Sequence, residues 1–393
     1  MLFDQYHYGD DRNRRNRYFH HSCDLGKVYS WPRFSNREFI FNLSLLLDTL
    51  RIFAATAVFL GHSNFPWFFG GGEIGPKNGQ DYVIIFFVLS GFVITWSIDR
   101  KKELTFSQYA FDRLTRLWSV ALPALVIGFA LDLWGRSISP ETYQNIFAKS
   151  YLEAKVLISS LFLHECWFFS VRPGSNGPFW SLSYEFLYYM IFGSIMLLPS
   201  LKSKLIGGLL WILVAGPKIL LLFPCWLIGC LAYYGCKSIR INIFLATFLV
   251  LLSGYFLITT MSDRWLHWSP WGYEGLGTPP LFYSAKYLDD YTIAGAVGLF
   301  LFSMSYWFSL ERKSNGLLAS LIRKCANCSF SLYAIHFPIM AFLGALWASN
   351  SLNRLGYVSG IMLVLGICFL FAIVFELPLK KYRSILIRIF PIL

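Results

Sequence analysis

The sequence predicts an all-α membrane protein with about ten transmembrane helices and both termini in the cytoplasm. Of its 393 residues, 56% are hydrophobic and 14% are charged, whereas about one-quarter of the residues in a soluble domain carry charge. An aromatic share of 19% is typical of chains that contact lipid and its interfaces. The apolar residues also form runs of about 20, as at 41–60 and 358–375, and a helix of that length spans a bilayer.

A polar segment precedes the apolar runs. Residues 1–40 contain the basic cluster RNRRNR and no signal-peptide core, so we expect a cytoplasmic tail. The membrane domain then covers 41–377, and an amphipathic cytoplasmic tail covers 378–393. We expect spans at about 41–61, 82–98, 117–134, 180–198, two within 205–235, 241–260, 291–310, 326–347 and 357–376.

The sequence predicts the form of two connections between the expected spans. The run 205–235 is long enough for two spans, and proline ends or kinks a helix, so we expect it to divide near Pro217 or Pro224. Residues 135–179 form a longer loop, whose apolar stretch at 156–169 is expected to be re-entrant or partly buried.

The net charge of +12 is distributed as membrane orientation requires. With ten spans and a cytoplasmic N-terminus, 24 of the 34 Lys and Arg residues fall on the cytoplasmic side and 9 fall outside. No basic patch interleaved with stacking aromatics indicates a nucleic-acid partner. The eight cysteines are scattered, which argues against a disulfide framework. The lone CxxC of Cys325 and Cys328 lacks the second pair of a zinc site, and we expect no metal.

The first span carries three ionisable side chains, Asp48, Arg51 and His62, which are costly in a membrane and therefore suggest function. Arg51 and His62 are 11 residues apart, close to three full turns, so they share one helix face with a rise of roughly 16 Å between them. Two interpretations remain open on spacing alone. The residues form a functional pair, or Arg51 extends to the headgroups beside Asp48 and His62 lies at the interface.

Five motifs carry a resemblance to a known family. The stretch LLLDTLRIFAATAVFLGH at 45–62 resembles the first helix of the acyltransferase 3 family. Further stretches are similar to later family motifs in the same order: IFFVLSGFVI at 85–94, RLTRLW at 113–118, GPFWSLSYEFLYY at 177–189 and SFSLYAIHFPI at 329–339. Together they cover most of residues 43–380. One departure is Gly61, which precedes His62 where the family has a bulky apolar residue.

The resemblance implies a membrane acyltransferase with an acyl-CoA donor, expected here to be acetyl-CoA. Moving an acyl group from a thioester to a hydroxyl needs a base, and histidine suits because its pKa lies near neutrality. We expect His62 to be that base or a transient acyl carrier. Arg51, Arg113 and Arg116 are expected to hold the phosphates of the donor, the alternative for the last two being that they only set topology. Glu185 is expected to support His62 or to bind the acceptor.

Five further residues are expected to support the site. Trp180 and Ser183 would position the outer end of the fourth span, and Ser331 would make a hydrogen bond between helices. Tyr333 and His336 are three residues apart and share a helix face. His336 is expected to assist catalysis or to line the donor channel.

We therefore expect an enzyme of the bacterial inner membrane that transfers an acetyl group from cytoplasmic acetyl-CoA to a hydroxyl of an envelope glycan or glycolipid. The aromatic loop at 261–290 is expected to stack on sugar rings or to lie at the membrane interface. The alternative is a transporter or flippase of a lipid-linked glycan, but such proteins often contain internal repeats, and none is visible. A glycan polymerase would be expected to place its chemistry in long outer loops.

Overall fold

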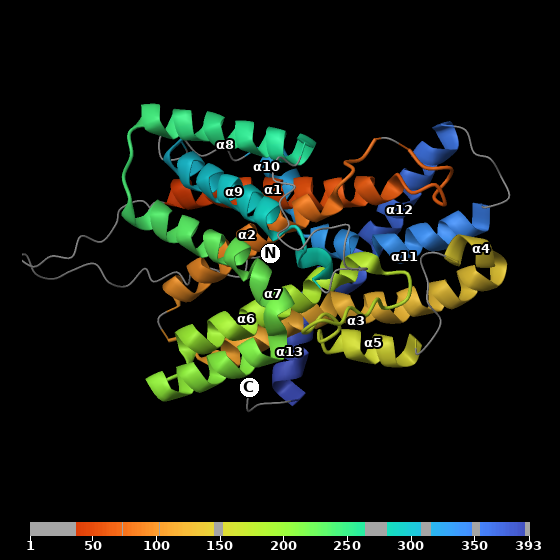
Figure 1. Ribbon diagram of the computed structural model, residues 1–393, viewed down its shortest axis with the longest axis horizontal. Coiled ribbons are helices and arrows are strands. Elements are labelled where there is room, and N and C mark those ends of the chain that lie inside the picture. The colour runs from red at the N-terminus through yellow and green to blue at the C-terminus, as the bar shows by residue number, and fades with distance from the viewer. Residues whose placement is uncertain are drawn as a thin grey trace, which may run out of the picture.

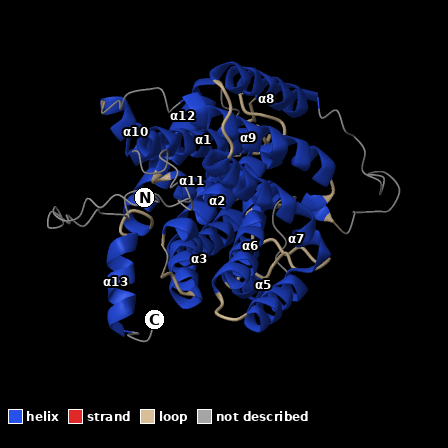
Figure 2. Cartoon of the chain, turned by 90° about the vertical axis from the view of Figure 1, so that its left-hand side faces the viewer, coloured by secondary structure: helices blue, strands red, loops and turns tan. Residues whose placement is uncertain are grey.

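The computed structural model describes residues 37–72, 74–101, 103–144, 152–263, 281–307, 316–347 and 354–389. Within these ranges all regular structure is helical (Figure 2). The α-helices are α1 (Arg37–Ser63), α2 (Gly79–Arg100), α3 (Phe106–Ile138), α4 (Pro140–Tyr143), α5 (Leu152–Ser160), α6 (Trp180–Leu197), α7 (Leu201–Ser238), α8 (Ile243–Asp263), α9 (Tyr287–Trp307), α10 (Leu317–Ala326), α11 (Ser329–Trp347), α12 (Arg354–Phe375) and α13 (Leu379–Ile389). Two short 3-10 helices are η1 (Gly177–Phe179) and η2 (Phe282–Ser284).

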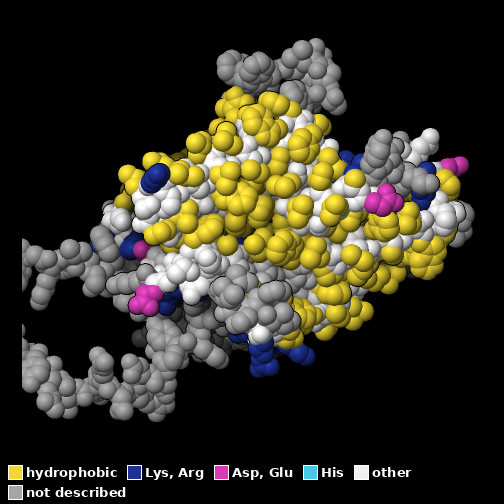
Figure 3. All heavy atoms as spheres, turned by 90° about the horizontal axis from the view of Figure 1, so that it is seen from below, with side chains coloured by type: hydrophobic (Ala, Val, Ile, Leu, Met, Phe, Trp, Pro, Cys, Tyr) yellow, Lys and Arg dark blue, Asp and Glu magenta, His cyan; other side chains and the backbone are white. Residues whose placement is uncertain are grey.

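Seven helices of the described chain are long and apolar enough to cross a membrane, namely α1, α2, α3, α7, α8, α11 and α12, the last continuing into α13. Most of them lie along the long axis of the molecule (Figure 1). Hydrophobic side chains cover most of the face in Figure 3, and charged side chains lie toward its edges. The chain is therefore an all-α, multi-pass membrane protein, as the composition predicts.

Helix α7 changes direction at Gly216. The backbone there has a φ of 74°, a left-handed value that favours glycine, and Pro217 follows. A Cβ on Gly216 would lie 2.7 Å from the Cα of Trp167, so a larger residue would also collide with the loop that packs there. The long apolar run thus divides at Pro217, one of the two positions expected, and α7 consists of two arms.

The third span begins earlier than expected, at Phe106 rather than near 117. Thr105 and Gln108 form a capping box in which each side chain accepts the backbone N–H of the other residue. This cap starts the helix a full three turns before the apolar run begins. Arg113 and Arg116 therefore lie inside α3 rather than in a basic entry loop, and their side chains project from a rigid element.

Helices α2 and α7 approach each other closely through two glycines. A Cβ on Gly91 would lie 2.0 Å from the carbonyl oxygen of Trp226, and a Cβ on Gly229 would lie 2.0 Å from that of Val88. Small residues at such crossings let two helix backbones pack directly, which is a main source of helix association in membranes. This contact fixes α2 and the second arm of α7 as the centre of the bundle, around which the site residues are arranged.

The C-terminal segments are also helical. The expected span at 326–347 is the helix α11, which runs from Ser329 to Trp347, and the short helix α10 ends just before it at Ala326. Helix α13 lies across the direction of α3 (Figure 1). Its Arg383 donates from Nε to Thr115 Oγ1 at 2.8 Å and pairs with Asp112 at 3.4 Å. The expected tail at 378–393 is thus attached to the same end of α3 that carries Arg113 and Arg116.

Candidate active site

Two histidines from opposite ends of the sequence meet in the bundle. His62 lies in the last turn of α1, and its Nδ1 is 2.9 Å from Nε2 of His336 in α11. The two rings are nearly parallel, with centroids 5.1 Å apart. His336 is fully buried, whereas His62 is partly exposed. The pair therefore has one enclosed member and one partly exposed member.

The hydrogen bonds of His336 determine the tautomers of both rings. Nδ1 of His336 faces the backbone carbonyls of Leu332 at 2.7 Å and Tyr333 at 3.0 Å, so that nitrogen must carry the proton and donate. Nε2 of His336 is then an acceptor, and Nδ1 of His62 donates to it. Nε2 of His62 retains its lone pair, and no hydrogen bond to it is formed within the described residues. An imidazole held in this way can accept a proton at Nε2, which is what a general base requires.

The chain after His62 folds back onto α1 and fixes the end of that helix. Asn64 donates from Nδ2 to the carbonyl of Gly75 at 2.9 Å and accepts from the N–H of Gly75 at 3.3 Å. A Cβ on Gly61 would lie only 2.8 Å from the carbonyl oxygen of Pro76. The departure from the family at Gly61 is therefore explained by this returning segment, which packs against the helix turn that carries His62.

The three arginines expected to bind the donor line one cavity. Arg51 from α1 and Arg113 and Arg116 from α3 line a cavity that also contacts α2, α6 and α11. Arg51 pairs with Asp48 at 3.8 Å, and both side chains are almost buried. Three guanidinium groups around one enclosed space form a strongly positive site that fits phosphate groups well.

Glu185 belongs to this cavity rather than to the histidine pair. Its Oε1 accepts a hydrogen bond from Ser90 at 3.1 Å and another from the hydroxyl of Tyr189, and all three residues line the cavity. Glu185 was expected to support His62 or to bind the acceptor, and its hydrogen bonds within the described residues go to Ser90 and Tyr189 and not to His62. The residue that bonds to His62 is His336. Glu185 lies about one and a half turns into α6, where it bonds to Ser90 of α2 and lines the same cavity as the arginines.

Tyr333 lies between the cavity and the histidines. Its ring lines the cavity, and its hydroxyl donates to the carbonyl of Pro178 at 2.6 Å and contacts Ser181 Oγ at 2.6 Å. The Tyr333 and His336 rings are 6.5 Å apart, whereas neither histidine is among the residues that line the cavity. Tyr333 therefore separates the arginine-lined space from His62 in this conformation.

The other expected support residues make structural contacts. Trp180 stacks on Tyr283 with ring centroids 4.3 Å apart, and Ser183 Oγ lies 3.0 Å from Nδ1 of His164. Ser331 connects two helices through its backbone N–H, which donates to Glu376 at the end of α12 at 2.8 Å. Most of the aromatic loop expected to contact sugars, including Trp265, Trp268, Trp271 and Tyr273, lies outside the described residues.

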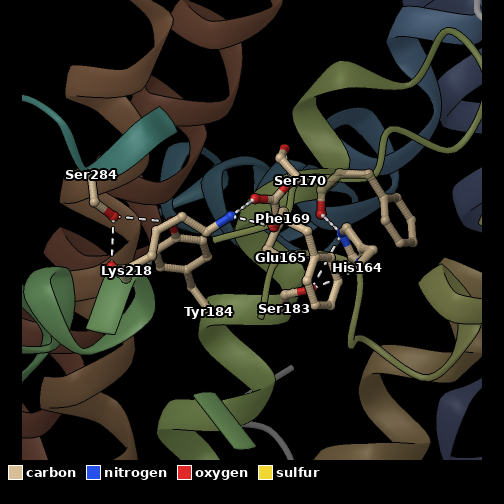
Figure 4. Close-up of polar contacts among 9 residues, drawn as sticks. His164, Glu165, Phe169, Ser170, Ser183, Tyr184, Lys218 and Ser284 are labelled. Atoms are coloured by element: carbon tan, nitrogen blue, oxygen red, sulfur yellow. Dashed lines mark hydrogen bonds and ion pairs between the residues drawn. The ribbon is translucent and has the colours of Figure 1, made fainter. Parts of the chain in front are cut away.

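A buried cluster that was not predicted from the sequence anchors the loop 161–179. Lys218, which follows the break in α7, donates to Glu165 at 2.5 Å and to the carbonyl of Phe169 at 2.7 Å (Figure 4). Both members of this ion pair are almost fully buried. Ser170 donates to the other carboxylate oxygen of Glu165 at 2.6 Å. A lysine inside an apolar run was the available signal, since such a charge needs a partner.

Burial changes the titration of the loop residues beside this pair. His164 is enclosed between Ser183 and Phe179 (Figure 4), and burial lowers its pKa to about 3. Burial likewise raises the pKa of Glu165, although the Lys218 ammonium opposes that shift. His164 is therefore a neutral hydrogen-bonding group at physiological pH, with no open side for a substrate.

The loop 161–179 also contacts the two helices nearest the histidines. Asn176 donates from Nδ2 to the carbonyl of Ala334 in α11 at 2.8 Å, and Ser175 donates from N and Oγ to Asp132 of α3 at 2.7 and 2.6 Å. Trp167 donates to the carbonyl of Ala215 at 3.0 Å, at the break in α7. The loop thus joins α3, α7 and α11 beside His336.

The chain is similar in sequence to known acyltransferases. The acyltransferase domain of the acyltransferase 3 family matches residues 45–373. The chain is similar to the acyltransferase MdmB of Streptomyces mycarofaciens, at 34% identity over 158 residues that cover 37% of each protein. It is also similar to the peptidoglycan O-acetyltransferase OatA of Listeria monocytogenes, at 28% over 42% of this chain and 27% of that protein. The O-acetyl transferase of Shigella phage Sf6 is 28% identical over 37% of this chain and 44% of that protein.

The aligned segments span less than half the length of each of these relatives. No solved structure matches the chain. The family match, in contrast, extends from the turn of α1 before Arg51 almost to the end of α12, so it contains both the histidine pair and the arginine-lined cavity. This chain therefore belongs to the acyltransferase 3 family of membrane acyltransferases.

Proposed function

We propose that this chain transfers an acetyl group from cytoplasmic acetyl-CoA to a hydroxyl group of an envelope glycan or glycolipid in the bacterial inner membrane. The single observation that supports this most strongly is the hydrogen bond from His62 to His336, which leaves Nε2 of His62 as a base. The arginine-lined cavity lies on the other side of Tyr333 from that base. The two sites suit the two halves of an acyl transfer, which are donor binding and deprotonation of the acceptor.

The donor occupies the cavity. Arg51, Arg113 and Arg116 hold its phosphate groups, because guanidinium groups form paired, charge-assisted hydrogen bonds with phosphate oxygens. Glu185 is the carboxylate among these cations, and it fixes Tyr189 through the hydrogen bond between them. The pantetheine arm then extends toward Tyr333. The roughly 16 Å rise from Arg51 to His62 along α1 is of the same order as the length of that arm.

The chemical step takes place at His62. The acceptor oxygen attacks the thioester carbonyl carbon while Nε2 of His62 removes the hydroxyl proton, and a tetrahedral intermediate forms. The intermediate collapses, the carbon–sulfur bond breaks, and the CoA thiolate takes the proton from His62. His336 is a positioning residue, because it keeps His62 in the tautomer with the open lone pair. For the thioester to reach His62, the Tyr333 ring must move aside.

A relay through an acyl-His62 intermediate uses the same lone pair. In that route Nε2 of His62 attacks the thioester first, the carbon–sulfur bond breaks, and CoA leaves as the thiolate. The acceptor hydroxyl then attacks the acyl-imidazole, the carbon–nitrogen bond breaks, and the hydroxyl proton passes to the CoA thiolate. The two routes differ in whether label is ever held on the protein, so rapid quenching of a reaction with acetyl-labelled donor separates them.

The bundle is oriented with the arginine end in the cytoplasm. This end carries the α2–α3 connection, the paired Lys237 and Asp99, and α13 with Arg383. The distribution of Lys and Arg along the chain favours this orientation. The proposed topology has ten spans, in which α6, α9 and the two arms of α7 are counted together with the other long helices.

Sealed membrane vesicles test both the donor and its side. Acetyl-CoA does not cross a bilayer, so inside-out vesicles given acetyl-labelled acetyl-CoA should label membrane glycan. Right-side-out vesicles should label it only after permeabilisation. Equal labelling of intact right-side-out vesicles would contradict the proposed orientation, and no labelling in any preparation would contradict acetyl-CoA as the donor.

A further inference from the structure

The loop 161–179 presents one guanidinium group beside the histidine pair. Arg172 is exposed and packs over Gly177, where a Cβ would lie 3.6 Å from Nε of Arg172. Asn176, next to Gly177, donates from Nδ2 to the carbonyl of Ala334 in α11, two residues before His336. The guanidinium of Arg172 therefore belongs to the part of the loop that packs on the turn of α11 carrying His336.

The loop that carries Arg172 is held firmly. On one side of it, Glu165 is paired with Lys218 (Figure 4). On the other side, Ser175 is bonded to Asp132 and Asn176 to the backbone of α11. Anchors both before and after Arg172 restrict its backbone, so the guanidinium is pre-positioned and loses little entropy when it binds a ligand.

Arg172 has no carboxylate partner within the described chain, where the ion pairs involve other residues. The nearest candidate, Glu165, already binds Lys218 through one oxygen and Ser170 through the other. Asp132 of α3, the other carboxylate that anchors the loop, accepts two hydrogen bonds from Ser175. Within the described residues, the buried charges of the loop are thus bound by other groups, and the exposed guanidinium of Arg172 forms no ion pair.

We propose that Arg172 binds an anionic group of the acceptor, a carboxylate or a phosphate, close to the hydroxyl that is acylated. This inference rests on the proposed function and names the class of acceptor for it. The planar guanidinium forms paired hydrogen bonds with either anion. The donor phosphates are held by Arg51, Arg113 and Arg116 across Tyr333, so the anion at Arg172 comes from the second substrate. The acceptor is thus an acidic sugar or a sugar or polyol phosphate.

The first test identifies the acylated residue. Membranes with the wild-type protein are given acetyl-labelled acetyl-CoA, and the labelled glycan is cut into single units that are identified by mass spectrometry. We expect the labelled unit to carry an acidic group. Cleavage of phosphate esters by hydrofluoric acid distinguishes the sources, because it removes a phosphate and leaves a carboxylate. A labelled neutral unit without phosphate would overturn the inference while leaving the acyltransferase activity established.

The second test uses Arg172→Gln and Arg172→Lys with the same isolated membrane glycan as acceptor. We expect Arg172→Gln to raise the KM for the glycan at least about tenfold and to leave the KM for acetyl-CoA unchanged. Arg172→Lys should recover part of the loss. Lys155→Gln, on α5 at the same end, is the matched control and should behave as wild type. An unchanged glycan KM in Arg172→Gln would overturn the inference, and no transfer by wild type would overturn the proposed function itself.

Discussion

Nδ1 of His62 lies 2.9 Å from Nε2 of His336, although 274 residues separate them in the sequence. The contact joins the first and eleventh helices and gives each histidine a distinct role. His336 donates its Nδ1–H to backbone carbonyls of its own helix, so its Nε2 can only accept a hydrogen bond from His62. The reactive nitrogen of His62 is therefore selected by a residue that does not itself face the substrate.

Replacing His336 tests this relationship. His336→Ala removes the acceptor for the His62 N–H, so the ring can turn or change tautomer. We expect kcat to fall about 10²-fold, as is typical when a reacting group is misplaced, with the KM for acetyl-CoA unchanged. His336→Gln should restore part of the rate, because its side-chain oxygen can accept the same bond. Steady-state kinetics in membranes measure both, and wild-type kcat in His336→Ala would contradict the proposed role.

Donor binding depends on the arginine cavity. Arg51→Gln, Arg113→Gln or Arg116→Gln should each raise the KM for acetyl-CoA about 10- to 100-fold, since hydrogen bonds to charged groups contribute about 1.5–3 kcal/mol. S-acetyl-pantetheine has no phosphates, so its KM should not change. Lys324→Gln, on exposed α10, is the control. Equal losses with both donors would mean that the arginines support the fold and do not bind phosphate.

The buried Lys218–Glu165 pair makes a prediction about stability. Lys218→Met leaves the Glu165 carboxylate buried without its partner, so the free energy of unfolding should fall by about 3–5 kcal/mol. The double variant Lys218→Met/Glu165→Leu removes both charges and should regain much of that loss. Thermal unfolding in detergent measures these differences. Additive destabilisation by the two substitutions would show that the ion pair is not what anchors the loop.

His164 predicts a pH dependence of stability. Its pKa is lowered to about 3 in the folded protein, from about 6.5 in an unfolded chain, so the unfolded state binds a proton first as the pH falls. Its contribution to stability is complete above about pH 6.5 and declines below it, by about 2 kcal/mol at pH 5. The melting temperature of His164→Gln should therefore fall less than that of wild type between pH 7.5 and 5. Equal shifts in the two proteins would contradict this assignment.

The sequence predicts the architecture well where the signal is local. Apolar runs and the position of Pro217 define the helices because length, hydropathy and backbone geometry act within one segment. Helix ends are less accurate, since the capping box of Thr105 and Gln108 extends α3 through a polar stretch that hydropathy assigns to a loop. The start of α3 matters for function, because it determines where Arg113 and Arg116 point.

The site is predicted only in part because it depends on contacts between distant segments. The face shared by Arg51 and His62 follows from helical periodicity, and the resemblance indicates the two later arginines. Which residue orients His62 depends on how α6 and α11 pack, and no periodicity within either helix distinguishes Glu185 from His336. The contacts of the loop 161–179 could not be predicted for the same reason, since the partner of Glu165 lies beyond the break in α7.

The most direct test of acyl transfer at His62 compares wild type with His62→Ala in membranes given acetyl-labelled acetyl-CoA. Thr49→Ala, an exposed position on the same helix, serves as the control. If His62 is the base, wild type and Thr49→Ala transfer label to membrane glycan, whereas His62→Ala binds the donor and transfers none. Undiminished transfer by His62→Ala would contradict the assignment of His62 as the base.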